Sequence, residues 1–93
     1  MAKVNLNLLN IFQLKLKEKS VKYEGKTVGD VISQFVKEYS DKLEDGMLSK
    51  NRKKLHKQML ILVNGRNITY LKDYKTKLND GDELYISVPL AGG

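Results

Sequence analysis

The residues best suited to chemistry in this chain are the last two, Gly92 and Gly93. Glycine has no Cβ, so a diglycine end presents a free α-carboxylate on a thin stretch of backbone that fits a narrow channel. ATP could activate such a carboxylate: an oxygen attacks the α-phosphate, and the acyl-adenylate then accepts a sulfur or amine nucleophile. A frayed terminus that happens to end in glycine would look the same. The residues before the diglycine therefore decide between the two interpretations.

No other group in the sequence offers comparable chemistry. The 93 residues include no cysteine, which excludes a disulfide framework, a cysteine-ligated metal and a thiol nucleophile. His56 is the only histidine and has no partner at ligand spacing, so we expect a solvated loop residue and no metal site. The sequence shows no nucleophile motif, phosphate-binding loop or dinucleotide fingerprint. It therefore predicts a partner or substrate of enzymes, not an enzyme, and no bound cofactor.

Length and composition favour one small domain. Hydrophobic residues make up 41% of the chain and charged residues 30%, which is ordinary for a soluble globular protein. The N-terminus lacks the charged-then-apolar pattern of a signal peptide. No apolar stretch approaches the roughly 18 residues that span a membrane. We therefore expect a soluble, cytoplasmic protein.

The net charge of +6 raises an alternative from a different class, a small basic nucleic-acid-binding domain. Its candidate surface is a cluster made of Lys50, Arg52, Lys53, Lys54, His56 and Lys57. A domain of this kind would bind with an affinity that falls steeply with salt. Because no stacking aromatic lies within the cluster, a solvated loop is the favoured interpretation, and nucleic acid is not expected as a partner.

Alternating apolar and polar residues predict strands in the first quarter of the chain. Val4, Leu6 and Leu8 follow the period of a half-buried strand. A less regular alternation over 14–23 is interpreted as the second strand of a hairpin. The connection would contain Ile11 and Phe12, the inward residues of the second strand would be Leu16, Val21 and Tyr23, and a turn would follow at Glu24-Gly25-Lys26.

The clearest element is a helix that begins after Thr27. Thr27 is a good N-cap, and Asp30 completes a capping-box pattern while placing negative charge at the positive end of the helix. One apolar face follows at helical spacing: Val28, Val31, Ile32, Phe35, Val36 and Tyr39, with Leu43 as a possible extension. Asp45-Gly46 ends the helical region, and 46–57 is interpreted as a polar, basic excursion.

The last third of the chain predicts further strands. The apolar run 59–63 is typical of a strand buried on both faces or nearly so, and Asn64-Gly65 is a tight-turn signal before a short returning strand at 66–68. Residues 70–78 are irregular, and 79–82 form a turn. The final strand alternates through Leu84, Ile86 and Val88 and ends at Pro89, which cannot donate a ladder hydrogen bond.

This order of elements predicts an α+β roll in which one main helix crosses one face of a mixed sheet of four to five strands. We expect a domain over 1–89 and a flexible tail over 90–93. The tail would project from the edge of the sheet, where another protein can reach it.

Three stretches carry a family resemblance: Leu62 to Ile68, Leu78 to Leu84, and Val88-Pro89-Leu90-Ala91-Gly92-Gly93. Together they resemble the small subunit of molybdopterin synthase in its archaeal form, a MoaD-like family. The resemblance covers nearly the whole chain and implies the ubiquitin-like β-grasp fold. Its most specific marks are the turn Asp80-Gly81-Asp82 and the alanine-diglycine ending.

The resemblance implies a mechanism centred on Gly93. A ubiquitin-activating-type adenylyltransferase would use ATP to adenylate the Gly93 carboxylate, and a persulfide would convert it to a thiocarboxylate. The tail residues Pro89, Leu90, Ala91 and Gly92 would then insert into the large synthase subunit, and sulfur would pass to the pterin precursor of the molybdenum cofactor. Related small archaeal modifiers and the ubiquitin-related modifier use the same activated tail to modify lysines of target proteins or to thiolate tRNA.

In this fold the sheet face away from the helix is the usual partner surface. Strand phase places Leu9, Leu60, Leu62 and Tyr85 on that face as a possible docking surface. The same residues could instead belong to the core. A structural adaptor that uses this surface and never the tail is a third hypothesis, and it predicts that substitution of Gly93 leaves function intact.

Overall fold

A computed structural model of the chain describes residues 1–89. The tail residues Leu90, Ala91, Gly92 and Gly93, on which the predicted chemistry depends, lie outside the described residues. The elements in chain order are β1 (Ala2–Leu8), α1 (Ile11–Leu16), β2 (Ser20–Gly25), α2 (Val28–Glu38), β3 (Leu60–Val63), β4 (Arg66–Asn67) and β5 (Glu83–Ser87). Short 3-10 helices lie at Asp45–Met47, Ile68–Tyr70 and Asp73–Lys75.

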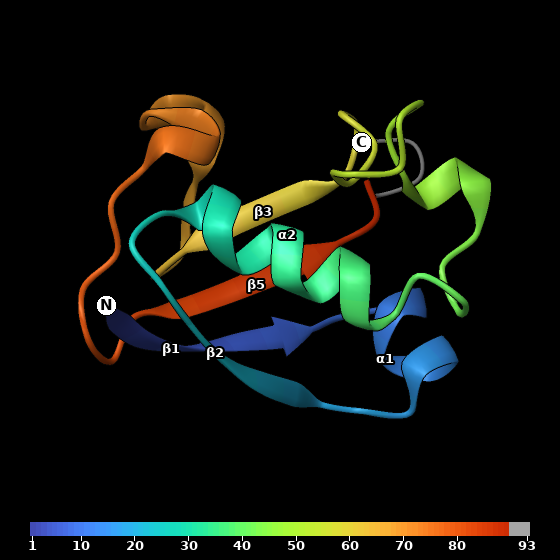
Figure 1. The fold of residues 1–93 in the computed structure, drawn as a ribbon, viewed down its shortest axis with the longest axis horizontal. Coiled ribbons are helices and arrows are strands. Elements are labelled where there is room, and N and C mark those ends of the chain that lie inside the picture. Colours follow the sequence, from blue (N-terminus) through green and yellow to red (C-terminus); the bar gives the residue numbers. More distant parts are fainter. Residues whose placement is uncertain (90–93) are drawn as a thin grey trace.

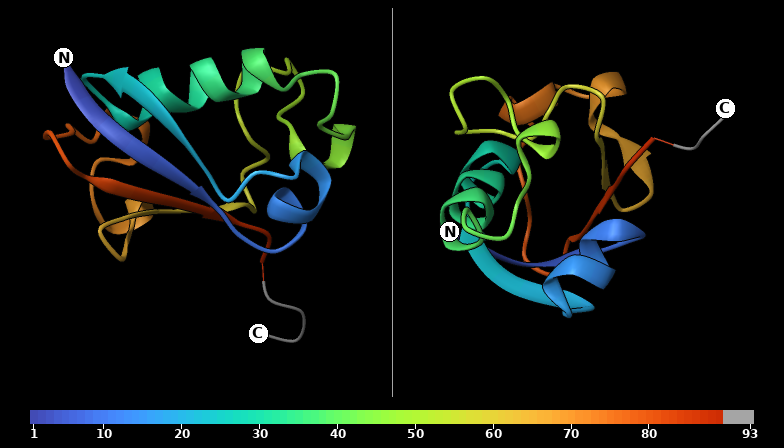
Figure 2. Two further views of the ribbon diagram at one scale, coloured as in Figure 1. Left: turned by 90° about the horizontal axis from the view of Figure 1, so that it is seen from below. Right: turned by 90° about the vertical axis from the view of Figure 1, so that its right-hand side faces the viewer.

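The strands form one mixed sheet in the order β2-β1-β5-β3-β4. Strands β1 and β5 pair in parallel, and the other neighbouring pairs are antiparallel. Helix α2 lies along one face of the sheet (Figures 1 and 2). The α+β architecture predicted from the sequence is therefore confirmed, with five strands and one main helix.

The core lies between α2 and the sheet face that it covers. Strand β1 alternates as predicted, with Ala2, Val4, Leu6 and Leu8 buried. The helix contributes Val28, Val31, Ile32 and Phe35, all fully buried. Burial of these side chains supplies most of the favourable free energy of a domain of this size.

Helix α2 begins where the sequence predicts. The Thr27 hydroxyl accepts a hydrogen bond from the Asp30 backbone N–H at 3.2 Å, and the Asp30 carboxylate accepts one from the Thr27 N–H at 3.1 Å. This reciprocal capping box satisfies donors that the first helical turn leaves without partners. The helix ends at Glu38, seven residues before the predicted end at Asp45, and Leu43 is buried from the loop that follows.

The predicted strand over 14–23 is wrong in its first half. Residues Ile11–Leu16 form α1, which buries Phe12 and Leu16 on one face because residues four apart share a helical face. Lys17 ends this helix in the left-handed conformation with φ 57°. Strand β2 starts only at Ser20 and includes Glu24 and Gly25, which the sequence analysis placed in a turn.

Strand β3 is shorter and less buried than the apolar run predicts. Ile61 and Val63 are buried beneath α2, whereas Leu60 and Leu62 are half-exposed on the opposite face. Among residues 1–89 no helix covers that face, so β3 is fully buried on one face only, and the predicted burial on both faces or nearly so holds only in part. The turn at Asn64-Gly65 is confirmed and leads into the two-residue strand β4, while Ile68 already belongs to a 3-10 helix.

In the described residues 1–89, the longest helix has 11 residues, and no helix is long and apolar enough to cross a membrane.

Candidate functional site

The strand that leads to the tail is the central strand of the sheet. Strand β5 pairs with β1 on one side and with β3 on the other, and Leu84 and Ile86 are completely buried. Val88 is half-buried and Pro89 is exposed directly beyond it. Strand β5 is therefore not an edge strand, and the predicted path of the tail from the edge of the sheet lies outside the described residues. Pro89 stands two residues from a firmly held strand.

The turn before β5 is confirmed and is fixed by side chains. The Asp82 carboxylate accepts a hydrogen bond from the Asn79 N–H at 2.8 Å, and the Asp80 carboxylate accepts one from the Lys3 N–H at 2.8 Å. The side chain of Asn64 bridges the neighbouring turn to this one, since it donates to Asp82 at 2.9 Å and accepts from the Glu83 N–H at 2.9 Å. These contacts fix the start of β5.

The predicted docking residues lie together on the sheet face away from α2, which we call the open face. Leu9, Leu60, Leu62 and Tyr85 are half-exposed there, so they are not core residues. Leu62 lies opposite Tyr85 in the ladder between β3 and β5. Leu9, Leu62 and Tyr85 line one hollow of about 460 Å³, which Asn64, Gly65 and Glu83 complete.

A second hollow of about 470 Å³ adjoins the first, since Leu62 lines both. Its other walls include Arg66, Tyr70 and Leu71. The Tyr70 side chain is 88% exposed, which is high for an aromatic residue. The sequence analysis did not single out Tyr70; its place in an irregular stretch gave no periodic signal to assign it to a face.

A polar group that the sequence analysis missed borders the first hollow. Asn5 Nδ2 donates to Glu83 Oε2 at 2.8 Å, and Asn7 Nδ2 donates to Glu83 Oε1 at 3.0 Å and to the Leu84 carbonyl at 3.0 Å. Hydrogen bonds from Asn7 and Asn5 hold the pKa of the Glu83 carboxyl below its ordinary value, against a smaller opposing effect of burial. The alternation of Asn5 and Asn7 with the buried residues of β1 placed them on the open face, but only the pairing of β1 with β5 brings Glu83 beside them.

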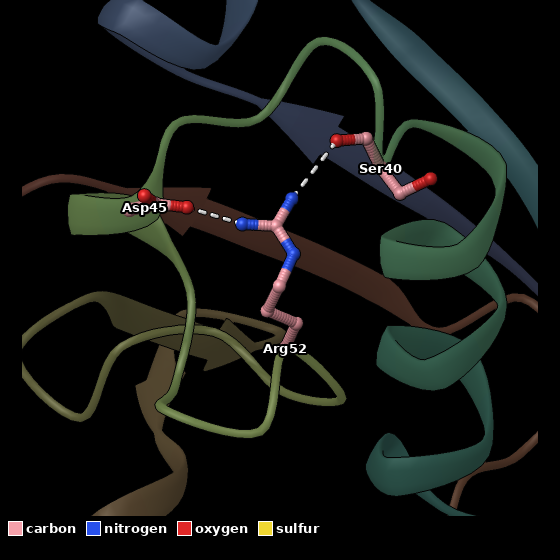
Figure 3. A network of polar contacts seen from close by, with 3 residues as sticks. All are labelled: Ser40, Asp45 and Arg52. Atoms are coloured by element: carbon pink, nitrogen blue, oxygen red, sulfur yellow. Dashed lines mark hydrogen bonds and ion pairs between the residues drawn. The ribbon is translucent and has the colours of Figure 1, made fainter.

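The basic cluster lies away from the open face, on a loop that is folded. Arg52 donates to the Asp45 carboxylate and, at 3.4 Å, to the Ser40 carbonyl (Figure 3). The Lys54 ammonium lies 5.0 Å from the ring centroid of Tyr74. The polar excursion also buries Met47, Leu48 and Leu55, so the interpretation as a merely solvated loop is incomplete. His56 is half-buried, and its Nδ1 accepts a hydrogen bond from the Gln58 N–H at 3.1 Å.

Residues 1–89 contain no group of three His, Asp or Glu side chains placed to hold a metal ion.

Comparison with known proteins identifies the family. The sequence matches the ThiS family over residues 3–93. It is 37% identical over 67 residues to small archaeal modifier protein 3 of Haloferax volcanii, covering 72% of this chain and 70% of that protein. It is also 36% identical over 76 residues to sulfur carrier protein CysO of Mycobacterium tuberculosis, covering 82% of each.

Solved structures show the same fold. The chain superposes on small archaeal modifier protein 1 of Methanosarcina acetivorans with a TM-score of 0.85, 28% identity and coverage of 100% of this chain and 98% of that one. It superposes on a chain of the Amycolatopsis orientalis BexX/CysO complex with a TM-score of 0.72, 28% identity and coverage of 97% and 99%. This confirms the β-grasp fold. The chain belongs to the ThiS family of ubiquitin-like β-grasp sulfur carriers, and it is a carrier protein, not an enzyme.

Proposed function

We propose that the Gly93 carboxylate is the group that this protein carries in activated form. The observation that carries the proposal is the family match, which extends from residue 3 to residue 93 and so includes the diglycine. In this proposal the β-grasp domain of residues 1–89 binds the partner enzymes, and residues 90–93 form the tail that enters their active sites. The central position of β5 supports this division, because a strand paired on both sides gives the tail a firm base.

Activation uses ATP supplied to an adenylyltransferase of the ubiquitin-activating type. A Gly93 carboxylate oxygen attacks the α-phosphate, and pyrophosphate leaves. The outer sulfur of an enzyme persulfide then attacks the acyl carbon and displaces AMP, which gives an acyl disulfide. A second enzyme thiolate attacks the sulfur of the acyl disulfide that is still attached to the enzyme. An enzyme disulfide forms, and the Gly93 thiocarboxylate is released. The carrier supplies no catalytic group to these steps.

For the sulfur acceptor we propose the pterin precursor of the molybdenum cofactor, reached when the tail from Leu90 to Gly93, which follows Pro89, inserts into a molybdopterin synthase large subunit. The resemblance of the last strand and the alanine-diglycine ending to that small subunit supports this choice.

A second use of the same tail has a specific observation in its favour. Proteins named small archaeal modifiers are among the relatives that are similar to this chain in sequence and in structure. The alternative is therefore attachment of Gly93 to target lysines, or transfer of its sulfur to tRNA. Both uses require the same adenylation step.

We further propose that the open face docks on the activating enzyme through Leu9, Leu60, Leu62 and Tyr85. Half-exposed apolar side chains around a hollow offer area that a partner can bury. The BexX/CysO complex shows a similar chain assembled with another protein.

The test is to incubate the protein with its host's activating enzyme, ATP and a sulfur donor, and to measure its intact mass. We expect a product in which one oxygen is replaced by sulfur. The same chain without Gly93, and the wild-type chain without ATP, should remain unmodified. If the complete mixture yields neither an adenylate nor a thiocarboxylate, the proposal is wrong.

The acceptor is tested in cells whose own copy of the gene is replaced by one lacking Gly93. Loss of molybdoenzyme activity alone would support the pterin route. Loss of thiolated tRNA or of lysine conjugates, with molybdoenzyme activity intact, would support the alternative. Full function in every assay would instead favour an adaptor that never uses its tail.

A further inference from the structure

The open face has two halves of different character, and Glu83 lies on the boundary between them. On β1 the face carries Asn5 and Asn7, and on β3 and β5 it carries Leu60, Leu62 and Tyr85. Glu83 pairs with Asn5 across the parallel ladder and also lines the hollow formed by Leu9, Leu62 and Tyr85. A carboxylate thus borders a recess whose large side chains are Leu9, Leu62 and Tyr85 and whose other polar side chain is Asn64.

This carboxylate is held in one orientation. Each of its oxygens accepts one amide hydrogen bond, from Asn5 at 2.8 Å and from Asn7 at 3.0 Å. A carboxylate offers about four lone-pair sites in total, so one site on each oxygen remains for another donor. Two parallel N–H groups on one plane match that pattern, and the guanidinium of arginine presents them in a fixed fork.

Within the part of the chain that the structure describes, no Lys, Arg or His side chain forms an ion pair with Glu83. The ion pairs among residues 1–89 join Lys15 to Glu44 and Arg52 to Asp45, both away from this hollow. The two asparagines satisfy part of the hydrogen-bonding capacity of Glu83 without neutralising its charge. A partner that covers the hollow must therefore pair with this carboxylate or bear the cost of burying an unpaired charge.

We propose that Glu83 is the specificity-determining residue of the open face and that it receives an arginine side chain of the activating enzyme. This inference rests on the function proposed above and names the chemistry of that partner. The arginine's alkyl stem packs against Leu9 and Leu62, its guanidinium forms a bidentate pair with the Glu83 carboxylate, and the Tyr85 ring lies at the wall of the same hollow. Apolar docking alone would accept many surfaces, whereas a fixed buried carboxylate rejects those without a matching cation.

The test compares Glu83→Gln with Glu24→Gln. Glu24 is exposed on the edge strand β2 and, by its pairing with Lys3, faces the same side of the sheet, so the two variants change net charge equally. Each protein is titrated against the host's purified activating enzyme by calorimetry, and KM and kcat for the carrier are measured in ATP-dependent adenylation. The thermal unfolding midpoint of each variant shows that it is folded.

We expect Glu83→Gln to raise Kd and KM about tenfold with kcat unchanged, because it removes one charged partner from a desolvated pair. Glu83→Lys should weaken binding further, and Glu24→Gln should match the wild type. Equal KM values for Glu83→Gln, Glu24→Gln and the wild type would overturn this inference while the proposed function stands. If the wild-type carrier itself is not adenylated, the proposed function fails and the inference fails with it.

Discussion

Substitution of two neighbouring residues of β3 tests whether the open face contributes to partner binding and the opposite face to stability. Ile61 is 3% exposed beneath α2, whereas Leu62 is half-exposed between the two hollows of the open face. The substitutions Ile61→Ala and Leu62→Ala remove aliphatic side chains of the same size at consecutive positions of one strand. The strand and the side-chain volume are therefore matched, and a difference of several kcal/mol exceeds the roughly 1 kcal/mol range of strand propensity and so reports the face.

The structure sets the expected size of each effect. Truncating a buried isoleucine to alanine costs about 2–5 kcal/mol in the free energy of unfolding, since it removes apolar contacts and leaves a cavity. In a domain of this length, each kcal/mol lowers the unfolding midpoint by about 4–8 °C. Leu62 buries only part of its side chain, so its truncation should cost about 1 kcal/mol. For binding, Leu62→Ala should have the larger effect of the two substitutions: it should weaken association with the activating enzyme about tenfold.

The assays are urea unfolding followed by circular dichroism, and calorimetric titration with the activating enzyme at a temperature where both variants are folded. Folded Ile61→Ala should bind as the wild type does. The reasoning is refuted if Leu62→Ala loses as much stability as Ile61→Ala, which would make Leu62 a core residue. It is also refuted if Leu62→Ala binds with unchanged affinity, which would place docking elsewhere.

Three further predictions concern the fold and its titration. Thr27→Ala should lower the free energy of unfolding by about 1 kcal/mol, because the Asp30 N–H loses its side-chain acceptor. Urea unfolding measures this change, and an unchanged midpoint would contradict the role of the capping box. Gly65→Ala should destabilise the protein by about 1 kcal/mol, because Gly65 has φ 89° and the added Cβ meets no neighbour, so the cost comes from backbone conformation alone. Gly46→Ala, at an equally open site without positive φ, should instead stabilise the protein by about 0.5 kcal/mol in the same assay, because alanine restricts the unfolded chain. Equal effects of the two substitutions would show that backbone conformation is not the cause. The lowered pKa of Glu83 means that its ionised form stabilises the folded state above the ordinary glutamate pKa of about 4.3, and this contribution is lost as pH falls through the folded-state pKa. Glu83→Gln should therefore be less stable than the wild type near pH 7, and the difference should shrink as pH falls below the ordinary glutamate pKa of about 4.3. A difference that stays constant as pH falls through the acid range would show that it does not arise from ionisation.

Local patterns predicted the regular elements well because each pattern reflects a single physical cause. The period of β1 and the apolar stripe of α2 follow from one-sided burial, and Thr27 and Asp30 mark the helix start through their own hydrogen bonds. Residues 11–16 were misassigned because Phe12 and Leu16, four apart, are consistent with a helix or with an irregular strand until the packing is known. The run at β3 suggested burial on both faces or nearly so, but within residues 1–89 no second layer covers the open face, and Leu60 and Leu62 are half-exposed.

The sequence by itself determined the fold class, the lack of a thiol, and Gly93 as the residue on which the proposed chemistry depends, because these follow from residue types and local periodicity. Only the tertiary structure decided that β5 is the central strand, that Leu9, Leu62 and Tyr85 share one hollow, and that Asn5 and Asn7 orient Glu83. The hydrogen bonds of Glu83 join residues more than 70 positions apart in the chain, since Asn5 is 78 and Asn7 is 76 positions from Glu83. The parallel pairing of β1 with β5 creates them, and no local pattern encodes which strands become neighbours.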